Sequence, residues 1–66
     1  MEYALDIIGN KVRVGDKVKI IPLENLEGRI IEKAFSVNTG TPMVKVRYFV
    51  DCRETTVWLY LDEVAQ

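Results

Sequence analysis

Short runs of alternating apolar and polar residues, separated at close intervals by turn-forming residues, dominate this sequence. The clearest runs are "MVKVRYFV" at 43–50 and "TTVWLYL" at 55–61. Alternation with a period of two places successive side chains on opposite faces of a β-strand, and strands favour β-branched and aromatic residues. The pattern therefore predicts a sheet of short strands and leaves little room for helices.

Four strands are predicted, at 11–21 (interrupted by Gly15-Asp16), 29–35, 43–50 and 55–61. Pro22 ends the first of them, because proline donates no hydrogen bond to a sheet. We expect loops between the strands at 23–28, 36–42 and 51–54. Gly28 is expected to supply a positive φ where the first loop ends. Residues 3–8 fit either a short strand or one helical turn.

The length of the chain limits how such strands can be arranged. Its 66 residues are near the lower limit for a single hydrophobic core, although 48% of them are hydrophobic. Closing a small antiparallel sheet into a barrel removes strand edges that it could not otherwise protect. We therefore predict an all-β fold, a small antiparallel barrel of about five strands. A single domain is expected over 1–66, with 1–10 as a short N-terminal extension.

The composition argues against several classes of function. Ten acidic and nine basic residues give a net charge of −1, so no broad electrostatic surface for nucleic acid or anionic membrane is expected. Histidine is absent, which removes the commonest general base and metal ligand. Cys52 is the only cysteine, as expected for a reducing cytoplasm, and it excludes an internal disulfide. We predict a cytoplasmic, non-enzymatic protein with no catalytic residue, metal site, cofactor or membrane segment.

The Gly15-Asp16 pair invites comparison with phosphate-binding glycine loops. Such loops need several backbone N–H groups and usually open a helix. Here a strand follows instead, and Asp16 would repel phosphate. We predict a tight turn in which Asp16 bonds to its own stretch of backbone.

Period-two alternation also divides the side chains of 43–50 and 55–61 between two faces. The aliphatic faces must point inward, which leaves an outward candidate site of Lys45, Arg47, Phe49, Trp58 and Tyr60. We place the hairpin turn between Cys52 and Arg53. The expected cross-strand pairs are then Arg47 with Trp58, Lys45 with Tyr60, and Phe49 with Thr56.

This outward face has several interpretations. Trp58 and Tyr60 are either ordinary packing residues of the barrel or anchors of a surface that binds a protein partner or a second copy, since Trp, Tyr and Arg are favoured there. A stacking platform for nucleic acid or a small-ligand site are further alternatives.

The segments "VRVGDKVKII", "LEGRIIE", "PMVKVRY" and "VWLYLDEV" resemble the pattern of SH3-like barrels over residues 11–64. The resemblance implies a terminal 3₁₀ turn at Asp62-Glu63-Val64. KOW and Tudor-like modules of this pattern bind RNA or modified peptides, and electron-transport accessory proteins of this pattern are docking subunits without a cofactor. The opening "DIIGNKVRVGDKV" is also similar to small phage-borne proteins, which implies a phage or mobile-element origin.

Plasmid-borne type II dihydrofolate reductase is a further SH3-like chain, which works as a tetramer with a V-Q-I-Y segment in its pore. The present "VWLY" at 57–60 matches Tyr60 but has Trp58 in place of the glutamine. The pore lysine of that family aligns with Lys19 or Ile20. A tryptophan at a central symmetric pore would block both ligands, NADPH and dihydrofolate. An enzyme of this kind is therefore the lesser alternative.

The favoured hypothesis is a small accessory module that docks a partner or itself through Lys45, Arg47, Phe49, Trp58 and Tyr60. The alternative is a KOW-like nucleic-acid binder. Its basic candidates are Lys11, Arg13, Lys17, Lys19, Arg29, Lys33, Lys45 and Arg47. As many acids offset these cations, so any affinity for nucleic acid is expected to be weak.

Overall fold

The computed structural model describes residues 4–5 and 11–66. Its elements are β1 (Ala4–Leu5), β2 (Lys11–Val12), β3 (Lys17–Ile20), η1 (Ile21–Leu23), β4 (Leu26–Phe35), β5 (Pro42–Val50), β6 (Arg53–Tyr60), η2 (Leu61–Glu63) and β7 (Val64–Ala65). Most of the predicted extension, 1–10, lies outside the described residues. No helix in the described part is long and apolar enough to cross a membrane.

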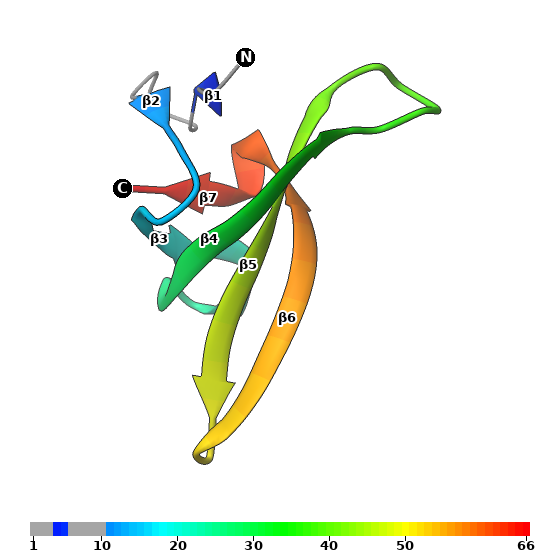
Figure 1. Cartoon of the computed structure of the whole chain (residues 1–66). Coiled ribbons are helices and arrows are strands. Elements are labelled where there is room, and N and C mark those ends of the chain that lie inside the picture. The colour runs from blue at the N-terminus through cyan, green and yellow to red at the C-terminus, as the bar shows by residue number, and fades with distance from the viewer. Residues whose placement is uncertain (1–3, 6–10) are drawn as a thin grey trace.

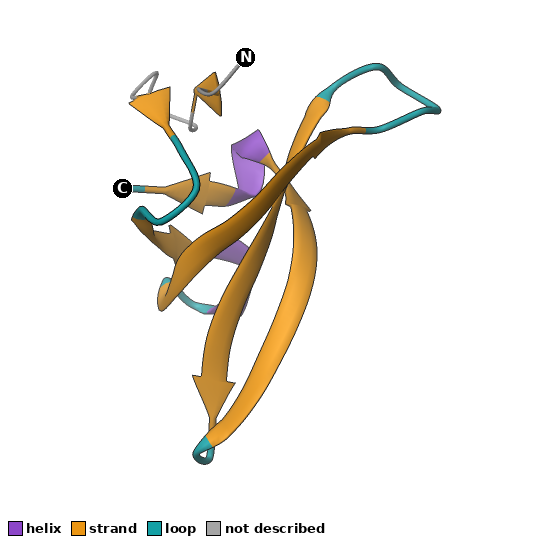
Figure 2. Ribbon diagram, viewed as in Figure 1, coloured by secondary structure: helices purple, strands orange, loops and turns teal. Residues whose placement is uncertain are grey.

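Strands β3 to β7 form one antiparallel sheet in the order β6-β5-β4-β3-β7, and β1 pairs separately with β2. The prediction of a small all-β fold is confirmed. β7 returns to pair with β3, a pairing that was not predicted from the sequence. η2 directly precedes β7 and begins one residue before the 3₁₀ turn expected at Asp62-Glu63-Val64. Figure 1 shows the long strands β4, β5 and β6 curving side by side, with β3 and β7 on the other side of β4. Figure 2 shows that short turns make nearly all the described connections.

The core lies on the inward face of this sheet. Its buried side chains among the described residues are all aliphatic, namely Val12, Val18, Ile20, Ile30, Val44, Val46, Leu59 and Val64. Tyr48, Val57 and Leu61 pack against this cluster and are partly buried. The inward faces predicted for 43–50 and 55–61 are therefore confirmed, because alternate residues of β5 and β6 supply core side chains.

The predicted turn at Gly15-Asp16 is confirmed. Gly15 has φ +99°, and the backbone N–H of Arg13 donates to Asp16 Oδ2 at 3.0 Å. The turn is also tied to β4, since the Gly15 N–H donates to the Ile30 carbonyl at 2.7 Å and the Ile30 N–H donates to the Asp16 carbonyl at 3.0 Å. These bonds give the glycine and the acid a structural role in the sheet.

The predicted loop at 23–28 is wrong over its second half. β4 begins at Leu26, and Gly28 pairs with Val18 inside the strand. The positive φ values occur earlier, at Glu24 (59°) and Asn25 (62°).

The real constraint on Gly28 is space rather than backbone conformation. A Cβ added to it would collide with Cγ1 of Val46 and lie 3.0 Å from the Arg47 carbonyl oxygen. It would also lie 3.3 Å from Cδ1 of Ile20. Strands β3, β4 and β5 approach one another so closely here that the neighbouring core side chains fill the position of a side chain.

We predict that Gly28→Ala destabilises the fold by about 1–3 kcal/mol, because the added methyl group overpacks the core against Val46. Urea unfolding measures the loss. Gly40→Ala is the control, since an added Cβ there meets nothing within 4 Å and the cost is limited to its positive φ of 68°. Equal losses in both variants would contradict the packing explanation.

The predicted hairpin loop at 51–54 is too long. Val50 pairs with Arg53, so the turn consists of Asp51 and Cys52 alone, with φ values of 50° and 65°. Two successive residues with positive φ are typical of the tight turn that matches the twist of a hairpin. Asp-Cys lacks the glycine that usually marks such a turn, which explains why the sequence suggested a longer loop.

We predict that Asp51→Asn combined with Cys52→Gly raises the free energy of unfolding by about 1 kcal/mol, because Asn-Gly adopts the left-handed conformations at lower cost. A shift of the urea midpoint to higher concentration measures the gain. Cys52→Ser keeps the β-carbon and should leave the midpoint unchanged. A stabilisation of the same size in that control would show that the thiol, not the backbone, is responsible.

Candidate functional site

The side of the sheet opposite the core is called the outer face below. All five predicted site residues lie on it: Lys45, Arg47 and Phe49 on β5, and Trp58 and Tyr60 on β6. Phe49 is 57% exposed, and Trp58 and Tyr60 are each 40% exposed. The structure thus brings the predicted residues onto one surface of two adjacent strands.

The predicted pairing of these residues is wrong by two positions. The observed cross-strand pairs are Lys45 with Trp58, Met43 with Tyr60, Arg47 with Thr56, and Phe49 with Glu54. The two-residue turn at Asp51-Cys52 causes the shift, because it brings Arg53 directly opposite Val50. A shift of two keeps every side chain on its face, so the composition of the outer face is unaffected.

The ammonium group of Lys45 lies near both an aromatic ring and a carboxylate. Its Nζ lies 5.9 Å from the centroid of the Trp58 ring and 3.8 Å from Oε1 of Glu32. Glu32 is opposite Lys45 because the register of β4 shifts between Ile30 and Glu32, where the strand contains a bulge or irregularity. The sequence carries no signal for this irregularity, so Glu32 was missed as a neighbour of the site.

Arg47 also has an acidic neighbour. Its Nη1 lies 3.9 Å from Oε1 of Glu54, the residue that pairs with Phe49. Both ion pairs are partly exposed, so each contributes little to stability. Their main effect is local, since each cation of the predicted site stands beside a carboxylate and the two charges nearly cancel.

A row of three cations crosses the outer face beside these pairs. Lys17 on β3 lies opposite Arg29 on β4, which lies opposite Arg47 on β5. Like charges directly opposite one another are unfavourable in a sheet. Arg29 is held in place by donating from Nη1 to the Gly15 carbonyl at 2.6 Å. Lys17 and Arg29 were predicted only as candidates for nucleic-acid binding, because the pairing of β3, β4 and β5 could not be read from the sequence.

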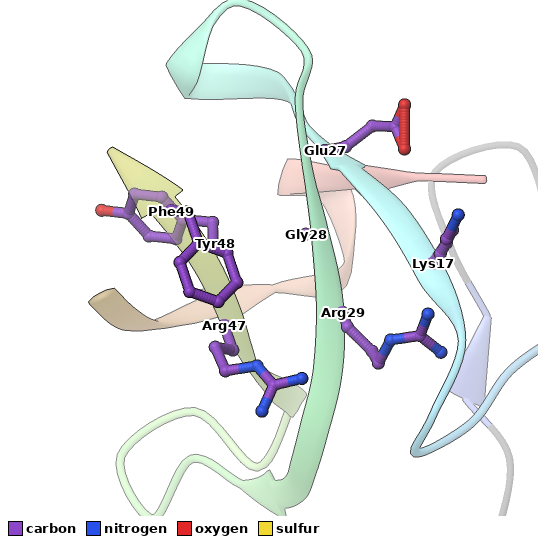
Figure 3. A pocket seen from close by; sticks show the side chains of 7 residues that line it. All are labelled: Lys17, Glu27, Gly28, Arg29, Arg47, Tyr48 and Phe49. Carbon is purple, nitrogen blue, oxygen red and sulfur yellow. The ribbon is translucent and has the colours of Figure 1, made fainter. Parts of the chain in front are cut away.

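The cation row borders a shallow hollow of about 160 Å³. It is lined by Lys17, Glu27, Gly28, Arg29, Arg47, Tyr48 and Phe49. Figure 3 shows Arg47 and the two aromatic rings on one side of β4, and Lys17 and Arg29 on the other. The hollow therefore combines cations with aromatic surface, interrupted by the carboxylate of Glu27.

The remaining polar candidates of the described part are its acidic side chains, Cys52 and Lys19. No group of three or more Cys, Asp or Glu side chains within 4–5 and 11–66 is arranged to hold a metal ion. Cys52 is exposed in the hairpin turn. Lys19, which aligns with the pore lysine of type II dihydrofolate reductase, pairs with Glu27 on β4, and β4 and β5 separate its strand from Trp58 and Tyr60 on β6.

Comparisons with known proteins do not narrow the function further. No protein-family model, curated protein or solved structure matches this chain. The chemistry of the outer face is therefore the main indication of a function.

We predict a coupling of about 0.5 kcal/mol between Lys45 and Trp58, because the ammonium lies at the outer limit of a cation–π contact at a partly exposed site. A double-mutant cycle of Lys45→Met and Trp58→Leu, followed by urea unfolding, measures it. The same cycle with Lys19→Met in place of Lys45→Met is the control and should give no coupling. Equal coupling in both cycles would contradict a specific contact.

Proposed function

We propose that this chain is a small non-enzymatic interaction module that docks a protein partner through the outer face of β5 and β6. The observation that carries the proposal is the exposure of Trp58, Tyr60 and Phe49 on one surface beside Lys45 and Arg47. Aromatic residues and arginine are the residues most often responsible for affinity at protein interfaces. Adjacent antiparallel strands hold their backbone in place, so little backbone ordering is needed on binding.

The charge balance of the outer face supports a protein partner over a polyanion. Glu32 stands beside Lys45, and Glu54 stands beside Arg47. Alternating charges of this kind fix the orientation of a partner with complementary charges. They also weaken the attraction for a uniformly negative backbone, which depends on unneutralised cations.

The proposal includes a cytoplasmic, phage or mobile-element setting. Its support is the similarity of the opening segment "DIIGNKVRVGDKV" to small phage-borne proteins and the single cysteine, Cys52. Part of that segment, 6–10, lies outside the described residues.

The partner proposal predicts that Trp58→Ala weakens capture of the partner at least tenfold, because interface aromatics contribute roughly 2 kcal/mol or more when they anchor binding. Tagged protein, a lysate of the source cells and quantitative mass spectrometry measure the capture. Phe35→Ala is the matched control, since Phe35 is 67% exposed but lies at the end of β4, opposite Pro42. Undiminished capture by Trp58→Ala, or equal loss in the control, would contradict docking through the outer face.

The second candidate function is nucleic-acid binding, favoured by the row of Lys17, Arg29 and Arg47 beside Tyr48 and Phe49. Cations that follow a phosphate backbone, with aromatic rings for stacking, are typical of single-strand binders. A titration of single-stranded RNA and DNA at low and high salt distinguishes the candidates. Steep salt-dependent binding that Arg29→Gln weakens, and that Lys19→Gln does not, would replace the protein-docking proposal with this one.

A further inference from the structure

Strand β6 has a free outer edge. It is the last strand of the five-stranded sheet, paired with β5 on one side and with none of the described residues on the other. Figure 1 shows no described segment alongside it. A free edge presents unpaired backbone N–H and C=O groups, which is a template for another strand.

This edge lacks most of the features by which proteins usually prevent pairing. β6 spans eight residues, "RETTVWLY", with no proline, glycine or lysine. Its register with β5 runs without a bulge from Val50–Arg53 to Met43–Tyr60. The opposite edge of the sheet is different, because β7 has only two residues. Short strands, bulges, proline and charged residues are the common protective devices, and in β6 only its first two residues, Arg53 and Glu54 beside the hairpin turn, are charged.

The geometry of the hairpin determines which backbone groups of β6 point away from β5. A two-residue turn makes Val50 and Arg53 a hydrogen-bonded pair, and such pairs alternate along an antiparallel ladder. The alternate residues Glu54, Thr56, Trp58 and Tyr60 therefore direct their N–H and C=O groups away from β5. The Tyr60 N–H donates to Glu63 Oε1 at 2.9 Å instead. The segment with both groups free is centred on Thr56.

We propose that β6 pairs antiparallel with β6 of a second copy of this chain, about a two-fold axis at Thr56. In this register Thr56 lies opposite its own copy, and Glu54 lies opposite the Trp58 of the second copy. Each of these pairs exchanges two backbone hydrogen bonds, so every free N–H and C=O of the segment is satisfied. With the axis at Thr55, the backbone groups of Trp58 would have no partner within the strand. With the axis at Val57, the pairing would need a hydrogen bond from the Tyr60 N–H, which already donates to Glu63.

The charges fit the same register. No like charges face each other, since Glu54 faces Trp58 and Arg53 faces Leu59 of the second copy. Glu54 also lies in the same row as the second copy's Lys45, which pairs with that copy's Trp58. The two five-stranded sheets join into one continuous sheet, and both outer faces lie on the same side of it. This dimer uses the strand edge and does not depend on the function proposed for the outer face.

Cysteine cross-linking tests the register. Thr56→Cys in a Cys52→Ser background places two thiols on the axis with Cα atoms about 5.5 Å apart, within the range of a disulfide. Mild oxidation should convert most of this variant to a covalent dimer. Glu54→Cys in the same background is the matched control. In the dimer its two introduced cysteines would be offset by four residues along the paired strands, which separates them by roughly 13 Å. Equal cross-linking of both variants, or none of either, overturns the proposal.

Sedimentation of the unmodified chain tests the dimer itself. Edge pairing buries a small interface, so the dimer should dissociate on dilution. The measured mass should be 7.6 kDa at low concentration and about twice that value at high concentration. Thr56→Lys places two ammonium groups on the axis and should shift this transition at least tenfold higher in concentration. Val37→Lys adds the same charge on a side chain that is 98% exposed in the loop at 36–41 and should not shift it. A wild-type chain that stays at 7.6 kDa, or a shift shared by both variants, contradicts the dimer.

Discussion

The close approach of β3, β4 and β5 at Gly28 is the constraint on which the rest of the structure depends. Val46 and Ile20 occupy the space that a side chain would need, so β4 can pair with β3 at one end and with β5 along the rest of its length. One long strand thereby connects both parts of the sheet. A chain this short has few other ways to enclose an aliphatic core without a disulfide or a metal.

The outer face follows from the same arrangement. Because core side chains occupy alternate positions of β4 and β5, Arg29, Lys45, Arg47 and Phe49 lie on the opposite side, whereas Tyr48 packs against the core. Neighbouring strands then decide which charges meet. Glu32 stands beside Lys45 and Glu54 stands beside Arg47, whereas Arg29 and Lys17 continue the row of cations from Arg47 across β4 and β3. The outer face thus has a balanced aromatic part and a cationic part, which favour different partners.

The two edges of the sheet differ for a physical reason. β7 is short because η2 occupies the residues before it and the chain is paired there only by Lys19 and Ile20 of β3. β6 is long because the tight hairpin at Asp51-Cys52 keeps it in register with β5 from end to end. Among the described residues, the sheet therefore has one short edge at β7 and one long edge at β6 that no strand covers, and the long edge is a template for another strand.

Alternation in the sequence determined the all-β class, the turn at Gly15-Asp16 and the face on which Lys45, Trp58 and their neighbours lie. These features depend on the two-residue period of a strand and on local turn chemistry, which a single chain displays directly. Pairing between strands was decided only by the tertiary structure. The left-handed turn at Asp51-Cys52 set the partners of Trp58, the register shift after Ile30 placed Glu32, and crowding at Gly28 kept that residue in a strand. The turn was missed because Asp-Cys lacks the glycine that usually marks it. The register shift and the crowding depend on how closely distant segments approach, which local sequence does not encode.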